Sequence, residues 1–175
     1  YEPFLNRWQR NTYHPDEQTT DLGRADALIF GMGRMGSAAY QFLVSEGYDP
    51  IGLDADMYKT KAHEDAGRNV FFADAEDSQF WKNVNLKQIK VAILAMDDIE
   101  SKLISVRMLR KYGFDGPIIS HALHEDHQER IRDAGATHTY LTMTQAGFGL
   151  AESAVLAMRG QEVPSDKAIA ADKAA

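Results

Sequence analysis

Short apolar runs alternate with longer amphipathic segments along most of the chain. The apolar runs lie at residues 27–30, 51–54, 70–73, 91–95, 118–120 and 139–141. Between them, hydrophobic residues recur every three or four positions, a spacing that predicts helices. We expect these helices over residues 34–46, 57–66, 78–84, 98–112 and 125–134. Most of them are followed by a glycine, which is typical of a helix C-terminus.

This alternation predicts an α/β fold with a parallel sheet that helices cover on both faces. Continuous apolar strands are typical of strands buried on both sides. Right-handed crossovers between the six expected strands give the order 3-2-1-4-5-6, which is a doubly wound, Rossmann-like arrangement. In such a sheet the ligand crevice lies at the carboxyl ends of the strands, between the first and the fourth strand.

A glycine motif follows the first apolar run. Gly31, Gly33 and Gly36 form the pattern Gly-x-Gly-x-x-Gly, and helical sequence begins within it. In dinucleotide-binding folds the first glycine makes a tight turn and the second lets the backbone approach a pyrophosphate. The third glycine lets the helix pack closely on the strand, and the free N–H groups at the helix start bind phosphate. The motif predicts a nucleotide site; the alternative is a glycine-rich turn in an α/β fold without a ligand.

Polar residues at the ends of the next strands extend this prediction. Asp54 lies 18 residues after Gly36, where an acid that binds ribose hydroxyls is expected. Because no arginine follows Asp54, unmodified ribose, as in NAD or AMP, is favoured over the 2′-phosphate of NADP. Arg34 either holds phosphate oxygens or faces solvent, and Asp74 either meets an adenine edge or caps the next helix. The full set of candidate cofactor-binding residues is Gly31, Met32, Gly33, Arg34, Met35, Gly36, Asp54, Ala55, Asp74, Ala75, Ala95 and Met96.

Histidines are concentrated after the fifth apolar run. His121, His124 and His127 are interleaved with two acidic residues, which is compatible with a metal site. Their spacing is not an established zinc spacing, so we expect a solvated helix start and no metal. The other histidines, His14, His63 and His138, have no evident partner in the sequence.

The sequence favours a domain that senses a nucleotide over an enzyme. A dehydrogenase needs a second region that holds substrate and supplies an acid or base near the nicotinamide. Only 34 residues follow Leu141, and they contain no histidine. Asp97 or Asp98 is expected to cap the next helix rather than to act as a base. The alternatives are the cofactor domain of an NAD-dependent oxidoreductase and an interaction scaffold that binds no nucleotide.

Composition excludes several classes of protein. The net charge of −7 argues against nucleic acid or an anionic membrane surface as a partner of the whole molecule. The absence of cysteine excludes disulfides, thiolate catalysis and cysteine metal sites. No apolar run approaches the length of a membrane span, and no signal peptide is visible. The chain begins at Tyr1 without an initiator methionine, so we expect it to be part of a longer protein.

The segments on either side of residues 25–142 differ from the central pattern. Residues 1–24 are polar and contain two prolines, and we interpret them as a linker from an upstream domain. Residues 143–160 contain an apolar helical stretch with no strand behind it. Such a helix buries its apolar face either on its own sheet or on a second subunit. Residues 161–175 are small and polar, and we expect a flexible tail.

Four motifs in register resemble the TrkA-N domain, also called the RCK or KTN domain. They are residues 28–36, 52–54, 70–75 and 94–98. Asp74 and Ala75 match the family's Gly-Asp-Ala-Thr signature, although Ala73 and Glu76 replace its glycine and threonine. The similarity extends over about residues 25–158, and the sequence looks closest to the C-terminal domain of Kef-type potassium efflux antiporters.

The resemblance implies a regulatory module at the cytoplasmic face of the inner membrane, joined by residues 1–24 to a K+/H+ antiporter domain of the same polypeptide. It implies a homodimer formed through the helix within residues 143–160, with AMP or NAD(H) bound in the crevice. Glutathione-gated relatives carry an Ala-Arg-Ala triplet after the fifth strand, whereas this chain has Ser120, His121 and Ala122. Control by glutathione is therefore in question.

Overall fold

A six-stranded parallel sheet forms the centre of the molecule in a computed structural model that describes residues 22–164. The strands are β1 (Ala27–Phe30), β2 (Pro50–Asp54), β3 (Val70–Phe72), β4 (Val91–Leu94), β5 (Ile118–Ala122) and β6 (His138–Leu141). Their order is β3-β2-β1-β4-β5-β6, which confirms the prediction. Most of the proposed linker and the tail after residue 164 lie outside the described residues.

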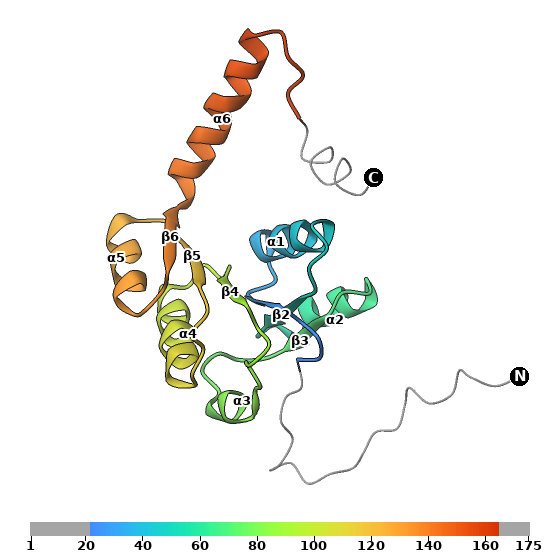
Figure 1. Ribbon diagram of the computed structural model, residues 1–175, viewed down its shortest axis with the longest axis vertical. Coiled ribbons are helices and arrows are strands. Elements are labelled where there is room, and N and C mark those ends of the chain that lie inside the picture. Colours follow the sequence, from blue (N-terminus) through green and yellow to red (C-terminus); the bar gives the residue numbers. More distant parts are fainter. Residues whose placement is uncertain (1–21, 165–175) are drawn as a thin grey trace, which may run out of the picture.

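Six helices connect and follow the strands (Figure 1). They are α1 (Arg34–Ser45), α2 (Met57–Asp65), α3 (Ser78–Asn83), α4 (Ile99–Lys111), α5 (Glu125–Asp133) and α6 (Thr142–Met158). The glycines that follow α1, α2, α4 and α5 donate their N–H groups back to the last helical turn, as expected of C-terminal caps. The predicted bounds are accurate to one residue for most elements. β5 is longer than predicted and includes His121.

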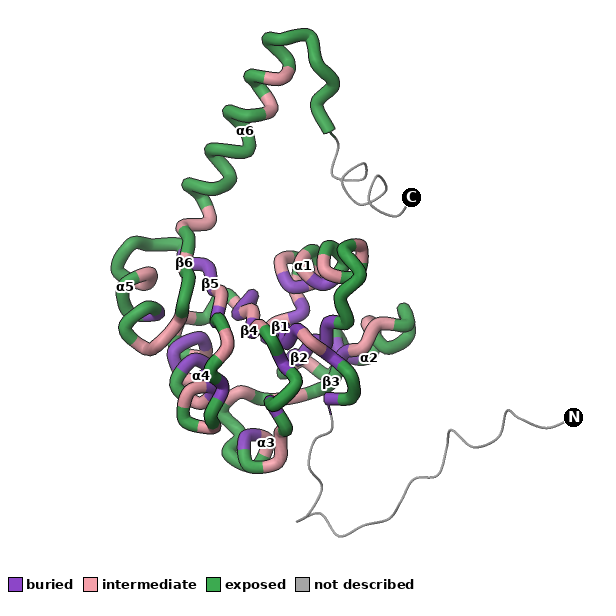
Figure 2. The backbone as a smooth tube through the Cα atoms, viewed as in Figure 1, coloured by how far each residue is buried: buried purple, intermediate pink, exposed green. Residues whose placement is uncertain are grey.

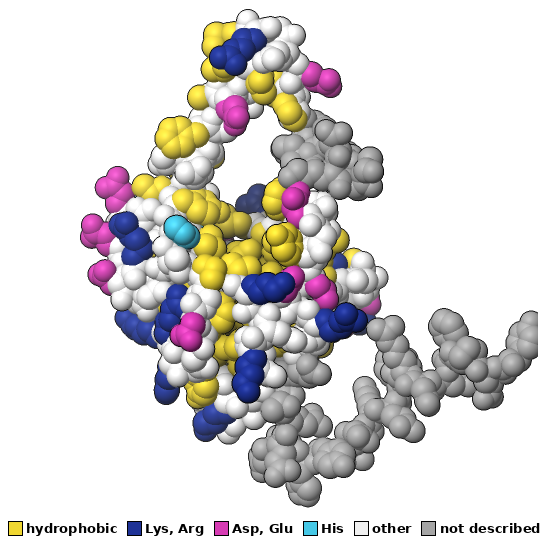
Figure 3. Space-filling view, viewed as in Figure 1, with side chains coloured by type: hydrophobic (Ala, Val, Ile, Leu, Met, Phe, Trp, Pro, Cys, Tyr) yellow, Lys and Arg dark blue, Asp and Glu magenta, His cyan; other side chains and the backbone are white. Residues whose placement is uncertain are grey.

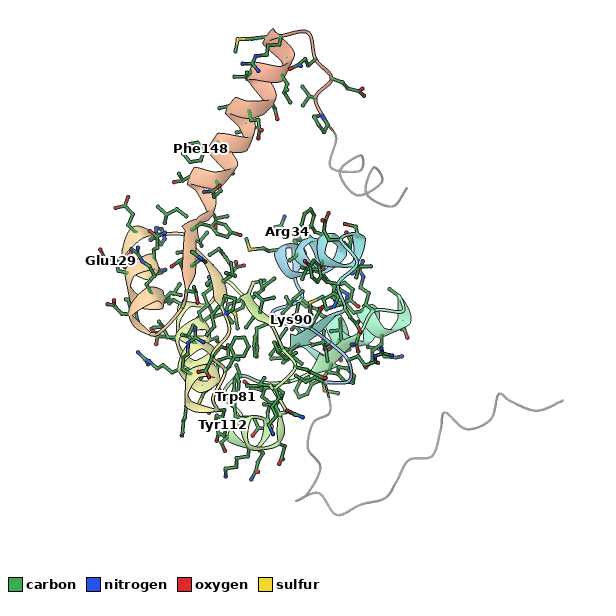
Figure 4. All side chains as sticks on the ribbon, viewed as in Figure 1. Arg34, Trp81, Lys90, Tyr112, Glu129 and Phe148 are labelled. Carbon is green, nitrogen blue, oxygen red and sulfur yellow. The ribbon has the colours of Figure 1, made fainter. Side chains whose placement is uncertain are left out.

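The core is divided by the sheet into two parts. On one face, Leu28 and Leu94 pack with side chains of α3, α4 and α5, among them Trp81, Val106 and Ile131. Trp81 is fully buried and stacks on Phe30 with ring centroids 5.7 Å apart. Figure 4 shows Trp81 beside Tyr112, the residue after α4.

A smaller core lies on the opposite face, beneath α1. Ile29 and Val70 pack there with Met32 and with Tyr40 of α1. The Tyr40 hydroxyl accepts a hydrogen bond from the Asn69 N–H at 2.9 Å, which ties α1 to the start of β3.

The face that carries α1 is only partly covered. By register, Ile93 of β4 lies beside Ile119 of β5, and His121 lies beside Tyr140 of β6. Ile93 and Ile119 are half-buried, and Tyr140 is exposed. Figure 3 shows hydrophobic side chains gathered between α1 and the base of α6.

Helix α6 extends away from the rest of the domain. None of its residues is buried, and Figure 2 shows it almost wholly exposed. Its large hydrophobic side chains include Met143, Phe148, Leu150, Val155 and Met158, all of them exposed. Within the described residues, this helix therefore presents these side chains to solvent.

Candidate functional site

A cavity of about 690 Å3 lies at the carboxyl ends of β1, β2, β3 and β4. This is the crevice that the strand order predicts. Its lining residues are Phe30, Gly31, Gly33, Arg34, Met35, Leu53, Asp54, Ala55, Lys59, Ala73, Asp74, Ala75, Ala95, Met96, Asp97 and Ser101. All of the candidate residues named from the sequence line it except Met32 and Gly36.

The two exceptions shape the turn that forms the cavity wall. The Met32 side chain is buried in the core beneath α1. A Cβ atom added to Gly36 would lie 1.9 Å from the Gly31 carbonyl oxygen, so no side chain fits there. Gly31 has a φ of +87°, and a Cβ added to it would lie 2.7 Å from the Met96 nitrogen. Close packing therefore requires glycine at both positions.

Gly33 has a different environment. A Cβ added there would have no atom within 4 Å, and Gly33 lines the cavity at the start of α1. Within residues 22–164, no side chain caps this helix start. The first N–H groups of a helix have no acceptor within the helix, and here the space beside them is open. Backbone donors and free space at a helix N-terminus are what a phosphate group requires.

Asp54 holds the glycine turn in place. Its Oδ2 atom accepts a hydrogen bond from the Met32 N–H at 2.7 Å, and its Oδ1 atom accepts one from the Asp56 N–H at 2.8 Å. The carboxylate is 9% exposed and lines the cavity. Each carboxylate oxygen has a second lone pair, so hydroxyl donors of a ligand can still bind. The contact with Met32 was not expected from the sequence.

The other side of the turn is held by His63, for which the sequence offered no partner. Arg68 donates a hydrogen bond to His63 Nδ1 at 2.9 Å, because a guanidinium has no acceptor. The proton of the ring therefore lies on Nε2, which donates to the Met32 carbonyl oxygen at 2.8 Å. The structure thus supplies the partners of His63 that were not evident in the sequence.

Two of the predicted roles for acidic residues are now resolved. Asp77, not Asp74, caps α3 by accepting a hydrogen bond from the Gln79 N–H. Asp74 accepts one from the Glu76 N–H within its own loop and lines the cavity. Asp98 caps α4 through the Ser101 N–H at 2.7 Å, and this hydrogen bond lowers the pKa of Asp98.

Two cationic side chains lie on the cavity wall. Arg34 is exposed at the start of α1, where Figure 4 labels it. Lys59 comes from the first turn of α2 and lies 3.9 Å from Asp56. The sequence analysis missed Lys59. Its position in the first turn of the helix after the second strand is the signal that would have indicated a residue of the cavity wall. Both cations can attract an anionic ligand.

Two buried side chains adjoin the cavity on the α4 side. Lys102 is 2% exposed, and its Nζ donates to the His121 carbonyl oxygen at 2.8 Å. Burial lowers the pKa of Lys102 to about 8, although Asp97 and Asp98 act in the opposite direction. Burial and the charge of Lys102 lower the pKa of His121, so its imidazole is neutral at pH 7.

The solvated helix start expected for the histidine segment is wrong for His121. This side chain is 1% exposed and lies on β5, where its ring contacts Met96 and Thr142. His124 precedes α5 and is exposed. Within residues 22–164, no group of three or more histidine, aspartate or glutamate side chains is placed to hold a metal ion.

The sheet order, the glycine turn and the cavity at the strand ends define a Rossmann-like domain of the nucleotide-binding type. The TrkA-N domain family matches residues 27–142, and the chain belongs to this family. None of the helices within residues 22–164 combines the length and the hydrophobicity that a membrane span requires.

Curated relatives of this chain are potassium efflux antiporters. A putative K(+) efflux antiporter KefB of Alkalimonas amylolytica is 32% identical over 129 residues, which is 74% of this chain and 20% of that protein. The glutathione-regulated potassium-efflux system protein KefC of Escherichia coli is 26% identical over 134 residues, 75% of this chain and 22% of that protein. The chain thus spans about a fifth of the length of these relatives.

Solved structures share the fold. The NAD(P)-binding domain of an exopolyphosphatase-related protein from Archaeoglobus fulgidus has a TM-score of 0.69 and 21% identity, covering 74% of this chain and 96% of that chain. The Shewanella denitrificans Kef C-terminal domain in its AMP-bound form has a TM-score of 0.61 and 19% identity, covering 84% and 87%. The GsuK channel bound to NAD has a TM-score of 0.61 and 20% identity, covering 75% and 24%.

Proposed function

We propose that this chain is the regulatory domain of a potassium efflux antiporter and that it binds an adenosine nucleotide, AMP or NAD(H), in the cavity. The observation that carries the proposal is the pairing of an uncapped helix start at Gly33 with the carboxylate of Asp54 across one cavity. Phosphate and ribose need these two kinds of group at adjacent positions. The relatives that bear the name Kef support the antiporter part of the proposal.

In this proposal each part of the nucleotide has a partner. The phosphate accepts hydrogen bonds from the N–H groups at the start of α1 and interacts with the guanidinium of Arg34. The ribose hydroxyls donate to the free lone pairs of Asp54. The adenine lies toward Asp74 and Ala75, which line the cavity after β3. A nucleotide with an unmodified ribose suits this site, since a 2′-phosphate would face the Asp54 carboxylate.

The lining favours a binding role over catalysis. Its titratable side chains are Arg34, Lys59 and three aspartates. Asp54 already accepts two backbone hydrogen bonds, and Asp74 accepts one. No histidine or tyrosine is among the lining residues of the described cavity. A hydride-transfer enzyme would need a positioned acid or base beside its substrate.

We further propose that the chain forms a homodimer through α6. This helix exposes Phe148 at 63% and Leu150 at 74% and has no buried residue. The half-buried Ile93 and Ile119, on the open face of the sheet, provide an apolar surface of the kind that a second copy can cover. Exchange of α6 between two copies buries both surfaces at once and obeys two-fold symmetry. The dimer would lie at the cytoplasmic face of the membrane, below the antiporter domain.

The test of the nucleotide site is the variant Gly33→Ala. The new methyl group meets no protein atom within 4 Å, and the φ of −72° suits alanine, so the fold is expected to survive. The methyl group occupies the space in which the phosphate must approach the backbone. We expect the dissociation constants of AMP and NADH, measured by calorimetry, to rise by a factor of about ten or more, which corresponds to a loss of about 1.4 kcal/mol or more of binding free energy.

Gly147→Ala is the matched control, because a Cβ added at Gly147 also meets no atom within 4 Å and lies outside the cavity. Thermal unfolding curves of both variants exclude a loss of structure. If Gly33→Ala binds both nucleotides as tightly as the parent chain, the phosphate is not held at this turn.

A further inference from the structure

We propose that His121 links the nucleotide cavity to helix α6, so that a nucleotide bound at the glycine turn changes how α6 is held. This inference rests on the proposed function, because it assigns a regulatory output to the same cavity. It is carried by a continuous row of contacts through Gly31, Met96, His121 and Thr142.

The first contact joins the glycine turn to the loop after β4. Gly31 packs so closely on Met96 that a Cβ would lie 2.7 Å from the Met96 nitrogen and 2.9 Å from its Cα atom. Met96 also lines the cavity. A ligand that presses on the glycine turn therefore meets the Met96 backbone directly, and a packed contact of this kind transmits small displacements.

The second contact joins this loop to β5. His121 Nε2 lies 3.1 Å from the Met96 carbonyl oxygen, which can only accept a hydrogen bond. Nε2 therefore carries the proton of the neutral ring, and Nδ1 is left as an acceptor. The ring is 1% exposed, so both nitrogens are shielded from bulk solvent.

The third contact joins β5 to α6. Thr142 Oγ1 lies 2.9 Å from His121 Nδ1, and the hydroxyl donates to this acceptor. The same hydroxyl lies 3.3 Å from the Ala122 carbonyl oxygen, which is its other available acceptor. Thr142 is the first residue of α6. A hydroxyl with two acceptors has two discrete arrangements, and the position of His121 decides between them.

This hydrogen bond matters because α6 has few other attachments. No residue of α6 is buried, and Met143 directly after Thr142 is 71% exposed. Among residues 22–164, the side chain of Thr142 is the only one in α6 that hydrogen-bonds to the sheet. The orientation of the helix is therefore set near its first turn, at the point where His121 holds it.

Two charged groups and one aromatic ring surround His121, from α4, from the loop after β4 and from β6. Lys102 of α4 binds the His121 carbonyl oxygen, and Asp97 after β4 lies 3.9 Å from His121 Nε2. Tyr140 of β6 faces the ring with centroids 6.4 Å apart. Asp97 is 85% exposed and lines the cavity, so a bound nucleotide also meets a charge that acts on His121.

The test uses Thr142→Val, which removes the hydroxyl, keeps the shape of the side chain and leaves the cavity lining unchanged. Hydrogen exchange of the amides at residues 142–148 is measured with and without saturating AMP and, in parallel, NADH. In the parent chain we expect the nucleotide to change these exchange rates at least roughly fivefold, the lower end of ordinary allosteric coupling. In Thr142→Val we expect a change of less than about twofold at saturation.

Two further variants separate coupling from a loss of structure. Thr142→Ser restores the hydroxyl and should restore the nucleotide response. Thr144→Val makes the same chemical change on the exposed side of α6 and should leave the response intact. An undiminished response in Thr142→Val overturns the link, as does a parent chain that binds nucleotide without any change in α6; both leave the proposed function standing. A parent chain that binds neither nucleotide in calorimetry overturns the proposed function itself.

Discussion

Asp54 shows how one side chain can serve both the fold and a site. Its two oxygens hold the N–H groups of Met32 and Asp56, so the carboxylate fixes the glycine turn before any ligand arrives. A charged acceptor of this kind is worth about 1.5–3 kcal/mol per hydrogen bond. Its remaining lone pairs face a cavity that it lines. The turn is thereby preorganised, and a nucleotide need not order it on binding.

Lys102 is a residue whose burial works against stability at neutral pH. Its pKa is lowered to about 8, so between pH 8 and the ordinary value of 10.5 the unfolded chain binds more protons than the folded one. Stability contributed at this site therefore rises with pH across that window, by at most about 1.4 kcal/mol per pH unit. Below pH 8 the ammonium is charged in both the folded and the unfolded state, so the full free-energy cost of its desolvation lowers the stability of the fold.

We predict that Lys102→Met stabilises the domain at pH 7.5 by roughly 1 kcal/mol, because an apolar side chain of similar length replaces a desolvated charge. The advantage over the parent chain should shrink as the pH rises from 8 to 10. Urea unfolding at pH 7.5 and at pH 10 measures this difference in the free energy of unfolding. Lys87→Met, at an exposed position, is the control. A Lys102→Met chain that is destabilised equally at both pH values would show that the hydrogen bond to His121 outweighs the burial of charge.

At the scale of elements, the sequence predicted the alternation well because each strand and helix carries its own pattern. Four-residue apolar runs such as Ala27–Phe30 and glycines at helix ends are local signals. Strand order then followed from the handedness of crossovers. The sequence also placed the cavity, since the strand ends must meet at the switch between β1 and β4.

What the sequence could not predict depends on contacts between distant segments. His121 was expected in solvent, because the residues after it are charged, yet Met96 and Thr142 enclose it from 25 and 21 positions away. His63 had no evident partner in the sequence, and it is hydrogen-bonded to Met32 and Arg68. Both cases have the same reason. The burial of a single polar side chain leaves no periodic pattern in the sequence, so its partners can be identified only from the packed structure.

Helix α6 gives the prediction at this scale. Phe148 projects from the side of α6 in Figure 4 and is 63% exposed, so Phe148→Glu should not disturb the fold of one chain. In a dimer formed through α6 the same change buries an unpaired charge, which costs several kcal/mol. We expect the dimer dissociation constant to rise by at least about a hundredfold.

Analytical ultracentrifugation measures this change directly. Gln145→Glu adds the same charge at another exposed position of α6 and serves as the control for charge alone. A Phe148→Glu chain that dimerises as tightly as the parent would place the interface elsewhere, for instance on the edge strand β3, where Phe71 and Phe72 are exposed.

At the scale of the whole molecule, one chain supplies the lining of the cavity, whereas apolar side chains of α6 remain exposed. The cavity walls come from one chain, from Phe30 at the end of β1 to Ser101 in α4. No residue of α6 is buried, and Ile93 and Ile119 on the open face of the sheet are half-buried; in the proposed dimer a second copy covers both surfaces. In our proposal, the nucleotide acts at the glycine turn and the second copy acts at α6, which are the two ends of the row of contacts through Met96, His121 and Thr142. A ligand can shift such an assembly only if it binds one arrangement better than the other.

The most direct test of the central claim is native mass spectrometry of the whole chain, sprayed first as purified and then after addition of AMP and of NADH. We predict a dimer of 19.6-kDa chains that carries one adenosine nucleotide per chain. Gly33→Ala should give the same dimer without the nucleotide. A chain that stays free of both nucleotides at millimolar concentration would contradict the claim that this cavity is a nucleotide site.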